Sequence, residues 1–239
     1  MEPKTRNFKT PLVTVDLAIF TVRDDALAVL LVQRAATAGD PHPLEWALPG
    51  GFIDIERDSD LVACARRKLK EKTGLVSPYL EQLGSWGSRK RDPRGWSVTQ
   101  VYFSLLPSEG IELRAGANTA SVRWARIEEG ACGIGERLAF DHGVILEAAL
   151  ERLRGKVEYT SLPAFLLPGE FTLSELQRAY EIVLSRPIEK SAFRTRVKDA
   201  GLVDPLPRMR RTTSRPARLY RLKDRAAPVY FPRTFSPRS

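Results

Sequence analysis

The stretch GGFIDIERDSDLVACARRKLKEKTGL, residues 50–75, decides the fold of the first half of this chain. Apolar residues recur every four positions between Leu61 and Lys72, which predicts an amphipathic helix. Ser59 is expected to cap the start of this helix, and Gly74 is expected to end it. A glycine pair, a charged loop and a helix with a basic end therefore occupy one short segment.

Segments rich in β-branched and apolar residues lie on both sides of this helix. Residues 11–22 and 26–33 predict two strands of a hairpin, joined by a turn at Asp24-Asp25. A short segment at 46–48 leads into the glycine pair, and the further predicted elements are strands at 79–86, 97–106 and 121–127 and a helix at 141–154. This succession predicts an α/β domain over residues 1–155.

Composition excludes several classes of protein. The chain has 239 residues, of which 43% are hydrophobic and 28% charged, so it can bury a core and is not disordered throughout. Its longest apolar run, residues 26–32, is far shorter than the roughly 20 residues of a membrane-spanning helix. The first ten residues contain no apolar signal segment, and two cysteines make no disulfide framework. We therefore expect a cytoplasmic protein without a membrane partner.

Charge divides the chain into two parts. Residues 1–155 contain 21 Lys and Arg and 21 Asp and Glu, whereas residues 156–239 contain 17 and 8, which accounts for the whole net charge of +9. A basic segment attached to a neutral one favours a polyanionic partner such as nucleic acid. A solvated basic surface is the alternative.

The basic part has the element order of a winged helix-turn-helix domain. Helices are predicted at 160–166, 173–184 and 189–200, the second with a capping box of Thr172 and Glu175. Two alternating stretches, 202–209 and 217–222, flank a basic turn at 210–214. We assign this domain to residues 156–225 and expect residues 226–239, which lack periodicity, to be a disordered basic tail.

One face of the third basic-domain helix carries several hydrogen-bond donors, spaced three and four residues apart. Arg194 suits guanine in a major groove, Arg215-Pro216 suits a narrow minor groove, and Arg196 points aside toward phosphate or solvent. The alternative is a solvated basic face. The predicted DNA-binding residues are Lys190, Ser191, Arg194, Thr195, Lys198, Arg210, Arg211 and Arg215.

Residues 51–75 resemble the Nudix box, G-x5-E-x7-R-E-U-x-E-E-x-G-U, where U is aliphatic. The match includes Arg67, Leu69, Glu71, Gly74 and Leu75, and includes Gly51 if the loop is two residues longer. The resemblance covers about residues 10–155 and implies an α/β/α sandwich. In Nudix hydrolases, carboxylates of this helix hold divalent cations against a diphosphate.

The box departs from that pattern at its acidic positions. Ser59 stands at the first glutamate (Arg57 without the insertion), Lys68 at the second and Lys72 at the last. The face of Lys68, Glu71 and Lys72 carries a net charge of +1, although Mg²⁺ needs several hard oxygen ligands. We expect hydrolysis to be lost, with no catalytic or metal-binding residue and no required cofactor, and expect the lysines to attract a pyrophosphate directly. Alternatively, they are solvated helix lysines.

A loop at 89–95 offers two further cations for phosphate binding, Arg91 and Arg94. An exposed hairpin turn is the alternative interpretation. The predicted effector-binding residues are Arg57, Lys68, Glu71, Lys72, Arg91 and Arg94.

Taken together, the two halves resemble the NrtR family, the Nudix-related transcriptional regulators of NAD metabolism. The supporting strings are Leu138-Ala139-Phe140-Asp141-His142, Leu167-Pro168, Phe171-Thr172-Leu173-Ser174-Glu175-Leu176-Gln177, Phe193-Arg194 and Arg215-Pro216-Ala217-x-Leu219-Tyr220-Arg221. The resemblance implies a homodimer that represses genes of NAD synthesis or salvage at a pseudo-palindromic double-stranded DNA operator. It also implies ADP-ribose or a related nucleotide diphosphate as effector.

Two rival hypotheses remain. The first is an active Nudix hydrolase, an ADP-ribose pyrophosphatase, that uses Glu71 with Asp54, Glu56 or Asp58. The second is a constitutive DNA-binding protein whose Nudix domain serves only as a dimer scaffold.

Overall fold

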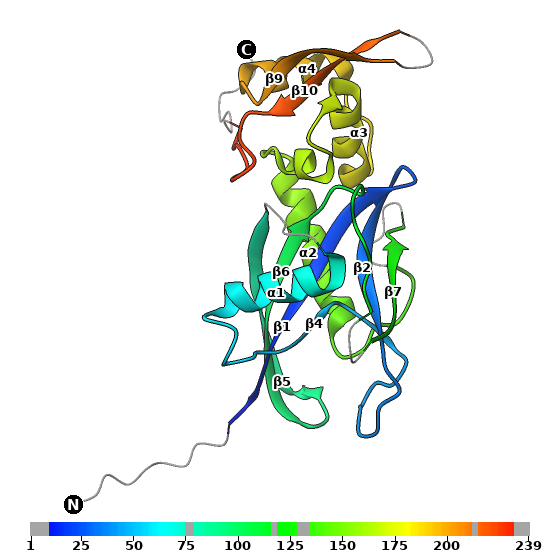
Figure 1. Cartoon of the computed structure of the whole chain (residues 1–239), viewed down its shortest axis with the longest axis vertical. Coiled ribbons are helices and arrows are strands. Elements are labelled where there is room, and N and C mark those ends of the chain that lie inside the picture. The colour runs from blue at the N-terminus through cyan, green and yellow to red at the C-terminus, as the bar shows by residue number, and fades with distance from the viewer. Residues whose placement is uncertain (1–9, 75–78, 116–118, 129–133, 212–214, 232–239) are drawn as a thin grey trace, which may run out of the picture.

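The computed structural model describes residues 10–74, 79–115, 119–128, 134–211 and 215–231. They form two folded parts joined by a long helix, α2 (Figure 1). The elements of the first part are β1 (Leu12–Arg23), β2 (Ala26–Arg34), β3 (Trp46–Ala47), β4 (Gly50–Phe52), α1 (Leu61–Thr73), β5 (Leu80–Asp92), β6 (Gly95–Leu105), β7 (Thr119–Arg126) and α2 (His142–Val157).

The first part is a sheet covered by a helix on each face. β1 lies at its centre, parallel to β6 and antiparallel to β2 and β4, while β5 extends the sheet beyond β6 and β7 pairs with β2. Alternation along β1 directs Leu17 and Ile19 toward Leu69 of α1, and Phe20 toward the α2 face. The α/β/α sandwich predicted from the sequence is confirmed.

The second part is a winged helix. Its elements are a 3-10 helix, η1 (Leu162–Leu166), then β8 (Phe171–Thr172), α3 (Leu173–Leu184), α4 (Lys190–Asp199), β9 (Val203–Arg210) and β10 (Ala217–Leu222). β10 pairs with both β8 and β9, so the wing hairpin is attached to the start of α3. The predicted capping box at Thr172 and Glu175 is present, with both reciprocal hydrogen bonds.

Some local predictions need correction. Asp60, not Ser59, caps α1, because its carboxylate accepts the Ala63 N–H at 2.7 Å. Gly74 ends the helix in the left-handed conformation, as predicted. Strand β5 continues to Asp92, so most of the predicted loop at 89–95 is sheet.

The predicted tail is ordered at its beginning, contrary to expectation. Residues 226–231 return to the segment after α2, where Phe231 is buried and its N–H donates to the Tyr159 carbonyl at 2.8 Å. Residues 212–214 of the basic turn and 232–239 of the tail lie outside the described residues. The domain boundary placed at residue 155 falls in the last turn of α2.

Among the described residues, no helix combines the length and apolar character that a bilayer span requires.

Candidate functional site

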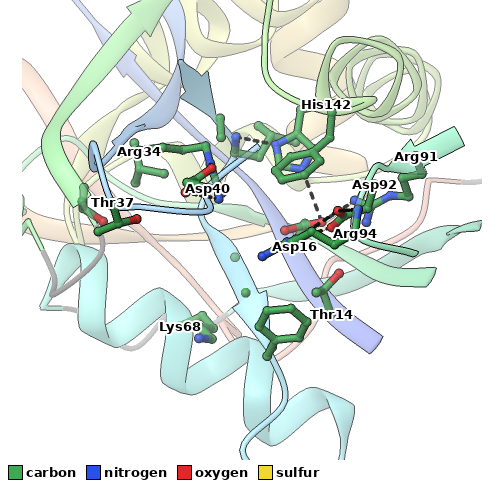
Figure 2. Close-up of a pocket in the computed structure, with 18 of the residues that line it drawn as sticks. Thr14, Asp16, Arg34, Thr37, Asp40, Lys68, Arg91, Asp92, Arg94 and His142 are labelled. Carbon is green, nitrogen blue, oxygen red and sulfur yellow. Dashed lines mark hydrogen bonds and ion pairs between the residues drawn. The ribbon is translucent and has the colours of Figure 1, made fainter. Parts of the chain in front are cut away.

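A cavity of about 800 Å³ opens between the sheet and α1 (Figure 2). Its walls come from β1, β2, β4, the buried side of α1, the end of β5 and the start of α2. Five of the six predicted effector residues line it: the cations Lys68, Lys72, Arg91 and Arg94, and the acid Glu71. Arg57 does not line it, because its exposed side chain turns toward Asp54 and Glu71.

The two lysines of α1 form a positive wall. Lys68 is half-buried and Lys72 is buried, with its Nζ donating to Thr119 Oγ1 at 2.7 Å, so neither is simply a solvated helix lysine. Burial lowers the pKa of the Lys72 ammonium, and the charge of Lys68 adds to this effect. Within the described ranges, these are the cavity-lining cations that form no ion pair.

Gly51 makes room for this wall. It has a φ of 141°, and a Cβ on it would lie 3.0 Å from Lys68 Nζ. Neighbouring Gly50 is more restricted still, since a Cβ there would lie 1.9 Å from Asp16 Oδ1. The glycine pair therefore lets the backbone of β4 pass close to both a cation and a buried acid.

The acids near the Nudix-like helix are held by arginines. Arg67 donates to both carboxylate oxygens of Asp58, at 2.7 and 2.6 Å, and to Glu71 Oε1 at 3.1 Å. The bonds from Arg67 lower the pKa of Asp58 well below its usual value. Among the described residues, no group of three or more His, Cys, Asp or Glu side chains is arranged to hold a metal ion. The donor set does not fit the Mg²⁺ site of a Nudix hydrolase.

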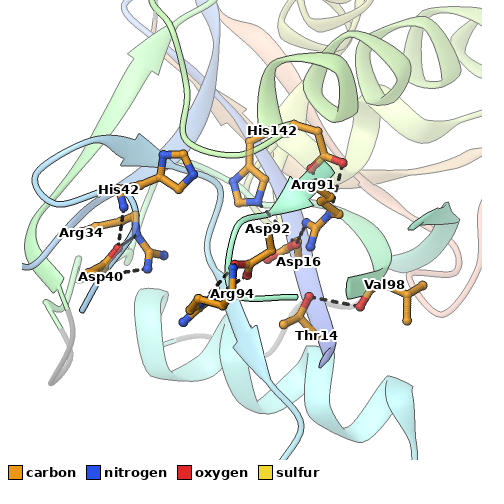
Figure 3. Close-up of polar contacts among 11 residues, drawn as sticks. Thr14, Asp16, Arg34, Asp40, His42, Arg91, Asp92, Arg94, Val98 and His142 are labelled. Carbon is orange, nitrogen blue, oxygen red and sulfur yellow. Dashed lines mark hydrogen bonds and ion pairs between the residues drawn. The ribbon is translucent and has the colours of Figure 1, made fainter. Parts of the chain in front are cut away.

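A buried polar network forms the floor of the cavity (Figure 3). Asp16 accepts from Arg91 Nη2 at 2.9 Å and lies 3.5 Å from His142 Nε2, while Arg91 Nε pairs with Asp141 at 3.0 Å. His142 Nδ1 accepts the Leu48 N–H at 2.9 Å. Burial opposes ionisation of Asp16, yet His142 and Arg91 outweigh it and hold its pKa below the usual value.

This network corrects the prediction for Arg91. Its side chain is only 4% exposed and is held by two aspartates, so it supports the floor instead of being presented by a turn. Arg94 does lie in the turn, where its guanidinium donates two hydrogen bonds to the Asp92 carboxylate, at 3.0 and 2.7 Å, and stacks on Phe52. Arg94 is therefore the more accessible of the two.

Sequence reasoning missed the wall opposite the lysines. Arg34 donates two hydrogen bonds to the carboxylate of Asp40, from Nε at 3.0 Å and from Nη2 at 2.6 Å. Its guanidinium carbon lies 4.9 Å from the centre of the Phe140 ring. Phe140 has a positive φ of 56°, and its ring also contacts His42. The planar Arg34–Phe140 stack suits an aromatic base. Phe140 and Asp141 belong to a string noted only for its family resemblance, which was the available signal.

The face of α4 predicted to contact DNA is open to solvent. Arg194, Thr195 and Lys198 are exposed, as are Lys190 and Ser191, while Phe193 and Val197 are buried. The Ser191 hydroxyl is already engaged, since it donates to the N-capping carboxylate of Glu189 at 2.7 Å. Arg196, expected to meet phosphate or solvent, is exposed as expected, and it also donates to the Glu158 carbonyl at 2.5 Å.

The wing arginines fall into two kinds. Arg210 is tied to the winged-helix body, because Nη1 donates to Glu175 at 2.5 Å and Nη2 to the Glu170 carbonyl at 3.2 Å. Arg211 and Arg215 are exposed. Their exposure places both side chains at the surface of the wing, where a DNA backbone can be reached.

Comparisons with known proteins agree with this two-part architecture. A family model described as the NrtR DNA-binding winged helix domain matches residues 163–222, and one described as the NUDIX domain matches residues 12–146. The ADPR responsive transcriptional repressor NtrR of Acinetobacter baylyi is 45% identical over 227 residues, which are 95% of this chain and 88% of that protein.

Two solved structures match, one over nearly the whole chain and one over the first part. The crystal structure of Shewanella oneidensis NrtR complexed with a 27mer DNA superposes with a TM-score of 0.82 and 41% identity, covering 94% of this chain and 99% of that one. The NUDIX domain of Shewanella oneidensis NrtR complexed with ADP ribose has a TM-score of 0.54 and 42% identity, covering 64% and 94% of the two chains.

Proposed function

The chain belongs to the NrtR family, and from this premise we propose that it is an ADP-ribose-responsive transcriptional repressor. Its winged helix binds an operator in double-stranded DNA, and its Nudix domain binds the effector. The observation that carries the proposal is the presence, in one chain, of an exposed basic α4 and of a cavity whose unpaired cations are Lys68 and Lys72.

The cavity suits a nucleotide diphosphate. The two ammonium groups of α1 supply positive charge for the diphosphate without a metal, and Arg94 adds a guanidinium near the rim. Across the cavity, the Arg34–Phe140 stack offers a planar surface to the base. Phosphate and base would thus be recognised by opposite walls, which fits ADP-ribose or a close relative.

We further propose that this site senses the nucleotide and does not hydrolyse it. Metal-assisted attack needs a cation that polarises the phosphoryl group and activates water. Here Lys68 and Lys72 occupy two acidic positions of the box, and Asp58 is engaged by Arg67. The rival hydrolase hypothesis predicts magnesium-dependent release of AMP from ADP-ribose by the wild-type protein.

The proposed operator complex is that of a homodimer. Two copies of α4 would enter major-groove faces about one helical turn apart on a pseudo-palindromic site. Arg194 is placed to read a base, and Arg211 and Arg215 to contact the backbone or minor groove. The regulated genes are those of NAD synthesis or salvage, as the family membership suggests.

Operator affinity with and without saturating ADP-ribose tests this function. We expect the dissociation constant for the operator to change severalfold. ADP-ribose has this effect if it binds one conformation of the protein more tightly than the other and the two conformations differ in operator affinity. An unchanged constant would favour the constitutive binder, and rapid magnesium-dependent turnover would favour the hydrolase. If no duplex is retarded at low ionic strength, DNA binding itself is refuted.

A further inference from the structure

Residues 226–231, which we call the C-terminal strap, close the winged helix against the end of α2 (Figure 1). The Ser161 N–H donates to the Val229 carbonyl at 2.9 Å, and the Val229 N–H donates to Ser161 Oγ at 2.9 Å. Tyr230 forms an antiparallel bridge with Thr160, and Phe231 is only 5% exposed. The strap follows the end of the matched winged-helix domain, at residue 222, and so adds to that domain.

The connection between α2 and the winged helix is held at three successive carbonyls. The Glu158 carbonyl accepts from Arg196 of α4, and the Tyr159 carbonyl accepts the Phe231 N–H. The Thr160 carbonyl accepts from the Tyr180 hydroxyl of α3 at 2.8 Å. Helices α3 and α4 and the C-terminal strap are therefore all attached to the same short segment.

Arg196 and Phe231 contact each other as well as this segment. The Arg196 guanidinium carbon lies 4.6 Å from the centre of the Phe231 ring, while Nη2 reaches the Glu158 carbonyl at 2.5 Å. One planar group thus stacks on the strap with its face and donates to the α2 end with its edge. Arg196 belongs to the same helix as Arg194, whose side chain is exposed on α4.

We propose that Arg196 and Phe231 are positioning residues for operator recognition, a role that rests on the proposed function. They fix the orientation of α4 relative to α2, and hence relative to the effector domain. A two-fold operator tolerates little variation in that orientation, because both recognition helices must reach their half-sites together. Neither residue needs to touch DNA for its loss to weaken binding.

Three variants of the full-length protein test this role: Arg196→Gln, Phe231→Leu and the double variant. Phe231→Leu keeps an apolar side chain in place but removes the ring on which Arg196 stacks. Arg194→Gln, which removes one positive charge from the same helix, is the matched comparison. The probe is the tightest duplex that the wild-type protein selects from a random-sequence pool, and binding is measured by fluorescence anisotropy over a series of salt concentrations.

We expect Arg196→Gln and Phe231→Leu each to weaken binding about tenfold, within the usual range of coupling between sites. The double variant should be little weaker than either single one, since the two residues act as a unit. The dependence of affinity on salt should be unchanged for Arg196→Gln, whereas loss of a phosphate contact reduces that slope by about one. ADP-ribose affinity should be unchanged in all variants.

A salt slope reduced in Arg196→Gln would make Arg196 a phosphate contact and overturn the proposal. Wild-type affinity in both single variants, or additive losses in the double variant, would overturn it as well. If Phe231→Leu does not fold, Arg196→Gln decides alone, because its side chain lies at the surface. Failure of the wild-type protein to select any duplex would refute the proposed function instead, so the two failures are distinguishable.

Discussion

The carboxylate of Asp25, in the turn between β1 and β2, forms a forked ion pair with the guanidinium of Arg178 on α3. This pair joins the hairpin of the Nudix domain to the first helix of the helix-turn-helix, 153 residues later in the sequence. Hydrogen bonds from Arg178 lower the pKa of Asp25. The two domains therefore touch at the hairpin as well as through α2.

Because both partners of this pair are largely exposed, we expect Asp25→Asn to reduce the free energy of unfolding by less than about 1 kcal/mol. The neighbouring turn residue Asp24 also has a positive φ, so Asp24→Asn is a matched control for the backbone. Chemical denaturation of both variants at low and high salt measures the difference. A loss above 2 kcal/mol would mean that the pair holds the domains together more strongly than surface ion pairs do.

The charge of the α1 wall can be reversed. Lys68→Glu combined with Lys72→Glu would place three carboxylates, including Glu71, on the cavity face, and we expect the variant to bind Mg²⁺ and to lose ADP-ribose affinity. Titration calorimetry measures both. The control is Arg66→Glu with Lys70→Glu, which makes the same charge change at the same spacing on the exposed side of α1. Equal Mg²⁺ binding by both double variants would contradict the placement of Lys68 and Lys72 at the cavity face.

Gly51 tests the position of the Lys68 ammonium. A methyl group in Gly51→Ala would lie 3.0 Å from Lys68 Nζ and displace it, so ADP-ribose affinity should fall about tenfold, the loss of one charge-assisted contact. Gly95→Ala is the control, since Gly95 has a similar positive φ of 158° but open space around it. Both variants should lose stability through backbone strain, and only the first should lose effector affinity in calorimetry.

Recognition by α4 is tested with Arg194→Ala. We expect operator binding to weaken by about 1–3 kcal/mol and preference for the contacted base pair to relax. Arg211→Ala should instead weaken binding to all duplexes alike and reduce the salt slope by about one. Anisotropy with the selected duplex and its single-base variants separates these outcomes. Equal losses on every duplex for Arg194→Ala would place that side chain on the backbone.

The start of α4 should be sensitive to acid. Backbone N–H groups of Ala192 and Ser191 lower the pKa of the Glu189 carboxyl from the usual 4.5 to about 2. A carboxyl whose pKa is lowered by folding stabilises the fold above pH 4.5, and this contribution is lost as pH falls from 4.5 to 2. Melting temperature should therefore fall less steeply over this range in Glu189→Gln than in the wild type. Curves of melting temperature against pH that run parallel for the two proteins would contradict a stabilising role of the ionised Glu189 carboxylate.

Local patterns could be predicted from the sequence. The bounds of α3 and its capping box were predicted correctly, because a cap and its partner lie three residues apart. The shared face of Lys68 and Lys72 was likewise predicted, since residues four apart on a helix are neighbours. The complete winged-helix order followed from helices and strands that each carry their own signals.

Contacts between distant residues could not be predicted in this way. Arg91 was expected in a loop, but its partner Asp16 lies 75 residues away and draws it into the floor of the cavity. The ordering of residues 226–231 depends on the backbone of Tyr159 and Ser161, some 70 residues earlier. Such pairings produce no periodic pattern in the local sequence, because tertiary packing decides them.

The length of helix α2 restricts which insertions and deletions a protein with this two-domain architecture can accept. Its first residue, His142, lies in the cavity wall, and its 16 residues span about 24 Å to the segment that receives Arg196. Removing a single residue from its middle would turn one end against the other by about 100°. The length of α2 therefore sets the rotation of the winged helix relative to the Nudix domain. Only insertions or deletions of whole helical turns would preserve that rotation.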